Sequence, residues 1–182
     1  SVYVKGDFND FDTVYEFGKR VDILTFELEN VNIEALQKLK SEGLKIVPDP
    51  DILALIQDKG LQKEFYAKHT MPTSPFVCCE NEEEIAEAIQ IGKLAYPFVQ
   101  KLRKGGYDGH GVSLINSSEE TLLDGTSMIE QKVDIDKEIA VIAARNSAGE
   151  VRCFPAVEMT FNDQTNLVEE IFCPANITQE QA

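Results

Sequence analysis

The stretch FVQKLRKGGYDGHG, which covers residues Phe98–Gly111, reads as a short strand that runs into a glycine-rich loop. Phe98, Val99 and Leu102 are residues that favour strands. Because side chains on an extended backbone alternate between two faces, we expect Val99, Lys101 and Arg103 to share one side. The strand therefore ends with a lysine, Lys101, close to the loop.

The loop places four glycines within seven residues: Gly105, Gly106, Gly109 and Gly111. Glycine permits positive φ and leaves backbone N–H groups uncovered, so such a loop can wrap an anion. With a lysine at the strand end, the loop would suit a phosphate, although a glycine-rich hairpin tip that binds nothing is the more common case. The order of the glycines is neither that of a P-loop nor that of a Rossmann or kinase loop.

Composition excludes several classes of function. The 182 residues carry a net charge of −15, which argues against a general nucleic-acid surface. No apolar run approaches the roughly 18 residues that span a bilayer, and no signal-peptide pattern opens the chain. The cysteine spacing does not predict a zinc site. Because each cysteine lies in an apolar, strand-like setting, we expect buried free thiols and a cytoplasmic protein. These are Cys78, Cys79, Cys153 and Cys173.

The first part of the chain has the alternating helix and strand pattern of an α/β layer. A helical period over Asp10–Arg20 is followed by a strand at Val21–Glu27, a helix at Val31–Glu42 and a strand at Leu44–Val47. This order predicts a parallel sheet, whose ligands bind at the carboxyl ends of strands, where Glu27 lies. A β-like run at Ser1–Lys5 precedes these elements.

Two helices and a linker follow. We expect helices over Asp51–Gln57 and Asp58–His69, and a linker over Thr70–Pro75 that makes a domain boundary near residue 70. Lys59 stands near the start of the second helix, where the helix dipole disfavours a cation. This placement indicates a role for Lys59 beyond helix stability.

A second α+β unit begins at Phe76. Helices are expected over Asn81–Ile91 and Ser117–Leu123, and one more begins at Ile177–Gln181. The expected strands are 76–79, 96–102, 112–115, 127–133, 137–146, 151–159 and 166–173. Glu138 begins the strand 137–146, whose even-numbered face is small and apolar. Its carboxylate could accept two hydrogen bonds from a ribose diol, although an exposed strand-end acid is the simpler interpretation.

Six stretches together resemble the N5-carboxyaminoimidazole ribonucleotide synthetase family of ATP-grasp enzymes, also known as the ATPase subunit of phosphoribosylaminoimidazole carboxylase. They are VDILTFELENV, QDKGLQKEF, MPTSPF, VQKLRKGGYDGHG, IEQKVDIDKEIAVIAARN and FPAVE. The loop GGYDG and its spacing to EQKVDIDKEI are the most specific parts. The resemblance covers nearly the whole chain and implies α/β and α+β architecture.

The resemblance also implies a division of the chain. Residues 1–57 would be the C-terminal part of a pre-ATP-grasp domain, and residues 58–75 a connecting helix and linker. Residues 76–133 would be the lid subdomain, and residues 134–182 the start of a second, incomplete ATP-grasp subdomain. The chain then looks truncated at both ends, and as a fragment it would be inactive, with Mg²⁺ ligands expected downstream and none within it.

The implied activity is that of a ligase, also classed as a lyase under the carboxylase name, in purine biosynthesis. It would convert aminoimidazole ribonucleotide, bicarbonate and ATP to the N5-carboxy product, ADP and phosphate through carboxyphosphate. ATP and Mg²⁺ would be cofactors, and the full-length protein a homodimer. Another ATP-grasp carboxylase or ligase, and a non-catalytic ATP-binding fragment, are the alternatives.

The resemblance assigns roles to individual residues. Lys59 and Lys101 would hold ATP phosphates under the glycine loop, the backbone from Glu130 through Gln131 to Val133 would bind adenine, and Glu138 would bind ribose. Tyr107 and Asp108 would lie near the reacting bicarbonate or aminoimidazole. His110 stands where the family usually has Arg or Lys, and a neutral imidazole would hold an anion less well. Glu27 would approach the nucleotide substrate.

Overall fold

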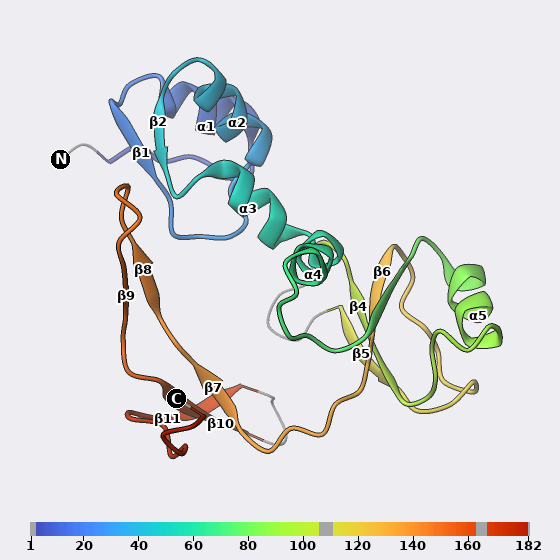
Figure 1. The fold of residues 1–182 in the computed structure, drawn as a ribbon. Helices are drawn as coiled ribbons and strands as arrows, with labels where there is room; N and C mark the ends of the chain where they lie inside the picture. Colours follow the sequence, from blue (N-terminus) through green and yellow to red (C-terminus); the bar gives the residue numbers. More distant parts are fainter. Residues whose placement is uncertain (1–2, 106–110, 163–166, 182) are drawn as a thin grey trace. The chain divides into compact units, whose positions relative to one another are not determined.

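The computed structural model describes residues 3–105, 111–162 and 167–181. The chain divides into two compact units, Ser1–Lys132 and Val133–Ala182, which are described separately below. Helices gather in the first unit and strands make up the second, as the ribbon in Figure 1 shows.

The first unit opens with the predicted α/β layer. Helix α1 (Phe11–Gly18) precedes strand β1 (Ile23–Thr25), helix α2 (Ile33–Ser41) and strand β2 (Lys45–Val47). The two strands pair in parallel, which confirms the expected strand–helix–strand unit. The core of this layer consists of seven buried residues: Val14, Leu24, Val31, Ala35, Leu36, Leu39 and Leu53.

Side-chain caps begin the helices of this layer. The Asp10 carboxylate accepts from the Thr13 amide at 2.7 Å, and the Asn32 side chain accepts from the Ala35 amide at 2.9 Å. Both bonds satisfy amides that have no partner within the helix. After α2 the chain turns at Gly43, whose φ of +96° an L side chain rarely adopts. The two following helices, α3 (Pro50–Gln57) and α4 (Lys59–Lys68), are also as predicted.

A four-stranded antiparallel sheet forms the rest of the first unit. Its strands are β3 (Phe76–Cys79), β4 (Phe98–Leu102), β5 (Val112–Ile115) and β6 (Ser127–Gln131), in the order β3-β6-β4-β5. Helix α5 (Glu82–Gln90), capped by Asn81 as expected, packs on one face of this sheet. The core between them is apolar and closely packed: Cys79, Ile85, Ala88, Leu94, Phe98, Ile115 and Ile129.

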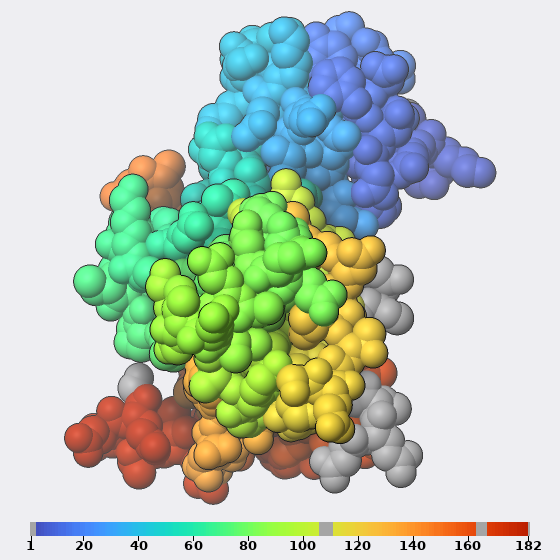
Figure 2. Space-filling view, turned by 90° about the vertical axis from the view of Figure 1, so that its right-hand side faces the viewer, coloured from blue at the N-terminus to red at the C-terminus, as the bar shows by residue number. Residues whose placement is uncertain are grey.

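The expected helix over Ser117–Leu123 is wrong, because that segment forms turns and irregular backbone. The buried side chain of Gln100 explains the difference. Its Nε2 donates to the Leu123 carbonyl at 2.9 Å, and its Oε1 accepts from the Leu123 amide at 2.8 Å. These bonds hold the segment against the sheet, and Leu122 packs on the core. In Figure 2 the segment lies beside α5 on the face toward the viewer.

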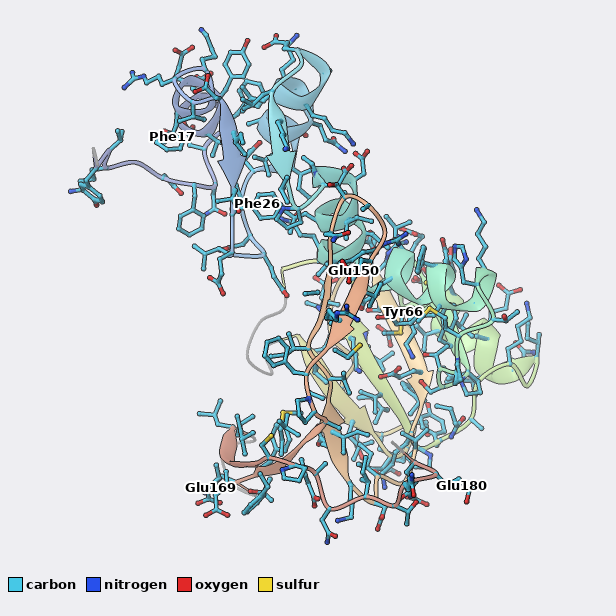
Figure 3. All side chains as sticks on the ribbon, turned by 60° about the vertical axis from the view of Figure 1, so that its left-hand side comes forward. Phe17, Phe26, Tyr66, Glu150, Glu169 and Glu180 are labelled. Atoms are coloured by element: carbon cyan, nitrogen blue, oxygen red, sulfur yellow. The ribbon has the colours of Figure 1, made fainter. Side chains whose placement is uncertain are left out.

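The second unit consists of β7 (Glu138–Ala140), β8 (Ala143–Arg145), β9 (Val151–Cys153), β10 (Val157–Phe161) and β11 (Val168–Phe172). The single strand expected over Lys137–Asn146 is wrong, since β7 pairs with β10 whereas β8 pairs with β9. Pro155 lies between β9 and β10 and has no N–H to donate, so it cannot continue a ladder. The β8–β9 hairpin turns just before Glu150, which Figure 3 labels.

Several smaller expectations are also corrected. Ile177–Gln181 contains a turn in place of a helix start, and residues 3–5 form no strand. Only part of the thiol prediction is confirmed: Cys79 is buried, Cys78 is half-buried, and Cys153 and Cys173 are exposed. Cys153 ends the exposed strand β9, and Cys173 directly follows the exposed strand β11. Of the helices that the structure describes, none is long and apolar enough to cross a membrane.

Candidate functional site

The two faces of the four-stranded sheet differ in chemistry, and the alternation of β4 sets the difference. Phe98 and Gln100 are fully buried on the face that α5 covers. Val99 and Lys101 point to the opposite face, as predicted. Glu130 on β6 is the register partner of Val99, so its carboxylate lies on this same face. We call this second face the charged face.

Glu130 is the centre of an ion-paired cluster on the charged face. Its carboxylate contacts the Lys63 ammonium at 2.6 Å, the Lys101 ammonium, and the Ser74 hydroxyl at 2.8 Å. The side chain of Glu130 is 12% exposed. Lys63 comes from α4, which Figure 3 shows with Tyr66 labelled, and Ser74 comes from the linker that follows.

The cluster keeps Glu130 ionised. Burial acts to raise the pKa of this carboxyl, but hydrogen bonds from Lys101, Lys63 and Ser74 outweigh burial and lower the pKa to about 2. Two ammonium groups and one carboxylate leave one net positive charge. The charged face therefore presents a cation beside the start of the glycine loop.

A second ion pair fixes the start of α4 to the end of β4. The Asp58 carboxylate accepts from Arg103 Nε and Nη2, both at 2.9 Å, and also from the Gly60 amide at 2.9 Å. Burial acts to raise the pKa of Asp58, and the bonds from Arg103 and the helix amides lower it overall. A Cβ on Gly60 would lie 2.6 Å from Arg103 Nε, so this close approach requires glycine.

Lys59 is held through its backbone at this junction. Its amide donates to the Arg103 carbonyl at 3.0 Å. On a helix, residues four apart lie on one face, so Lys59 stands one turn from Lys63 on the side that meets the sheet. The structure thus brings Lys59 to the strand end that also carries Lys101.

Part of the glycine loop lies within the described residues. Gly105 and Gly111 have φ values of +74° and +73°, the conformation for which the sequence analysis expected glycine. The Leu102 amide donates to the Gly111 carbonyl at 2.8 Å, which closes the base of the loop. The other predicted loop residues lie outside the described residues: Gly106, Tyr107, Asp108, Gly109 and His110.

The remaining predicted site residues belong to other parts of the fold. The Gln131 amide donates to the Pro75 carbonyl at 2.9 Å, and its side chain donates to the Pro97 carbonyl at 3.0 Å. Val133 and Glu138 belong to the second unit, where Glu138 begins β7 and is exposed. Glu27 is exposed two residues after β1.

Four residues of the site were not assigned a role from the sequence: Asp58, Lys63, Ser74 and Arg103. Lys63 carried a usable signal, because it follows Lys59 by one helical turn. Asp58 carried one too, as an acid directly before an amphipathic helix. The described residues hold no group of three or more His, Cys, Asp or Glu side chains that could bind a metal ion.

Comparison with known proteins matches the chain to two domain families. The ATP-grasp domain family matches residues 64–182, and the ribonucleotide synthetase preATP-grasp domain family matches residues 1–57. A phosphoribosylaminoimidazole carboxylase from Ogataea methanolica is 33% identical over 96% of this chain and 33% of its own length.

Two solved structures are also similar. The N5-carboxyaminoimidazole ribonucleotide synthetase of Thermotoga maritima has a TM-score of 0.81 and 34% identity, over 97% of this chain and 44% of that one. An N5-carboxyaminoimidazole synthase from Aspergillus clavatus, in complex with ADP and 5-aminoimidazole ribonucleotide, has a TM-score of 0.78 and 27% identity, over 96% and 46%. The chain thus spans a third of that carboxylase and less than half of each synthetase.

Proposed function

Because the chain belongs to the ATP-grasp family, we propose that the protein containing it carboxylates 5-aminoimidazole ribonucleotide in purine biosynthesis. Bicarbonate attacks the γ-phosphate of ATP and releases ADP. The resulting carboxyphosphate delivers carbon dioxide to the amine and releases phosphate, and the product is N5-carboxyaminoimidazole ribonucleotide. The names of the relatives support this reaction, as does the complex of one of them with ADP and aminoimidazole ribonucleotide.

The observation that carries the proposal is the cation at the mouth of the glycine loop. Lys101 lies one residue before the end of β4, and Gly105 opens the loop shortly after it. The Lys63–Glu130–Lys101 cluster has one net positive charge, which suits a phosphate. Phosphoryl transfer depends mostly on positioning and charge neutralisation, and these groups supply both.

The residue roles follow the sequence analysis. We assign Lys59 and Lys101 to the ATP phosphates, under a loop that includes Gly105, Gly106, Gly109 and Gly111. The backbone of Glu130, Gln131 and Val133 would bind adenine, and Glu138 would bind ribose. Tyr107, Asp108 and His110 would face bicarbonate or aminoimidazole, and Glu27 the nucleotide substrate.

We also assign the protein a metal ion, an oligomeric state and a cellular location. Mg²⁺ would accompany ATP and neutralise charge on its phosphates, as in other phosphoryl transfers. We assign it no ligand among the described residues, which hold no suitable group of side chains. We also propose a homodimer and a cytoplasmic location, the latter because the four cysteines are free.

The test measures phosphate release by the full-length protein with ATP and bicarbonate. We expect release to depend on aminoimidazole ribonucleotide, and Lys101→Ala to raise the KM for ATP about tenfold or more through the lost charge-assisted bond. The matched control is Lys93→Ala, which removes an exposed lysine in the turn after α5 and should leave the KM unchanged.

The result also separates the alternatives. Release that ignores aminoimidazole ribonucleotide but responds to another amine or carboxylate would identify a different ATP-grasp ligase. ATP binding without release in the full-length protein would identify a non-catalytic nucleotide-binding protein. Equal ATP affinity in the wild type and Lys101→Ala would overturn the assignment of Lys101.

A further inference from the structure

Lys63 has no ammonium hydrogen left for a ligand. Its Nζ donates to Thr73 Oγ1 at 2.6 Å and to Ser74 Oγ at 2.8 Å, and it contacts Glu130 Oε2 at 2.6 Å. An ammonium group has three donors, so all three are used. The side chain is 12% exposed and its ammonium lies 5.9 Å from the centre of the Phe76 ring. The ammonium group of Lys63 is therefore fully engaged by protein side chains.

Lys101 contacts the other oxygen of the Glu130 carboxylate and is more accessible than Lys63. Its ammonium contacts Glu130 Oε1, and its side chain is 29% exposed. Among the described residues this contact is the ion pair that it makes, which leaves donors for a ligand. Glu130 thus connects a saturated lysine to an accessible one.

We propose that Lys63 is a positioning residue that acts on ATP through Glu130, by fixing that carboxylate and offsetting its charge so that Lys101 can bind phosphate. The inference rests on the proposed function, because it takes ATP as the ligand of Lys101. It assigns no contact between Lys63 and ATP.

The charge balance gives the physical reason. With Lys63 present, the cluster carries one net positive charge, and Lys101 shares Glu130 with a second cation. Without Lys63, Glu130 and Lys101 neutralise each other, and a phosphate must compete with the carboxylate for the Lys101 ammonium. Because Glu130 stays ionised, with its pKa lowered to about 2, protonation cannot relieve this competition near neutral pH.

The experiment titrates ATP directly against the full-length protein and its variants, and follows turnover in parallel. We expect Lys63→Met to weaken ATP binding about tenfold, and this loss to shrink at high ionic strength, because it is electrostatic. The KM for ATP should rise more than kcat falls. Lys63→Arg keeps the charge and should restore most of the affinity, and Lys68→Met, an exposed lysine on the same helix, is the control.

A double variant separates charge from folding. Lys63→Met combined with Glu130→Gln again leaves one positive charge, on Lys101, and no carboxylate that competes for it. We expect the double variant to bind ATP more tightly than Lys63→Met alone. A purely structural Lys63 predicts the reverse, since the double variant removes more contacts.

The outcomes distinguish the two proposals. A wild type that does not bind ATP refutes the proposed function. A wild type that binds ATP, together with a Lys63→Met variant of equal affinity, refutes only the role of Lys63. Thermal unfolding of each ligand-free variant identifies weak binding caused by loss of fold, and in that case the Lys63→Arg and double variants decide.

Discussion

The two faces of the four-stranded sheet come from the same strands but differ in burial and charge. The face under α5 is closed, with Phe98 and Ile129 fully buried against the helix. The charged face carries Lys101 and Glu130, and α4 reaches it through Lys63. Because neighbouring residues of a strand point to opposite faces, one short strand supplies both a buried core and a charged surface. Substitutions on the two faces should therefore affect stability for different physical reasons.

The largest difference between the faces is expected from a pair of apolar truncations. Ile129→Ala creates a cavity in the closed face and should lower the free energy of unfolding by about 3–4 kcal/mol. Leu114→Ala on the charged face removes a side chain that is 43% exposed and should cost less than about 1 kcal/mol. Denaturant unfolding of both variants measures the contrast, and similar losses would contradict it.

Asp58→Ala tests whether the charged face also contains a structural element. The variant removes the carboxylate that Arg103, whose side chain is 18% exposed, contacts at 2.9 Å, and leaves it with the exposed Glu80 at 3.6 Å. We expect a loss of about 3 kcal/mol, because breaking a largely buried pair strands a charge. Asp10→Ala, which removes an exposed helix cap, is the control and should cost less. Equal losses would mean that only the cap matters.

Acid should weaken the charged face through Glu130. Its pKa is lowered from an ordinary value of 4.5 to about 2 in the folded protein. A carboxyl whose pKa is lowered on folding stabilises the folded protein at pH values above its ordinary pKa. This stabilisation is lost as the pH falls toward the pKa of the folded state. The stability difference between wild type and Glu130→Gln should therefore narrow by about 2 kcal/mol between pH 7 and pH 3. Urea unfolding at both pH values measures this, and a constant difference would refute the linkage.

The smallest expected effect concerns the one polar side chain that β4 buries in the closed face. Gln100→Leu leaves the Leu123 amide without its acceptor and should cost about 1 kcal/mol, since the added apolar contact offsets part of the loss. Hydrogen exchange at Leu123 should accelerate more than exchange in β6. Gln90→Leu, on the exposed side of α5, is the control and should change stability by less than about 0.5 kcal/mol.

Elements with strong local signals could be predicted from neighbouring residues alone. Three features depend on neighbouring residues and could be predicted: the helical period and cap of α2, the strand–helix–strand order, and the alternation of β4. The glycine loop and its adjacent Lys101 were found in the same way. Ser117–Leu123 has equally plausible helix signals, but buried hydrogen bonds to Gln100 override them.

The pairing of the charged side chains depends on how the elements pack in space. Lys63 and Glu130 form an ion pair although they are far apart in the sequence. The same is true of Asp58 and Arg103. No local sequence period encodes such long-range contacts. The packing of α4 on the sheet brings them together, and hydrogen bonds from Lys63, Lys101 and Ser74 outweigh burial and keep Glu130 ionised. The sequence could therefore single out Lys101 as a candidate phosphate ligand, whereas the ion pairs around Lys101 required the folded chain, because charge interactions depend on distance in space.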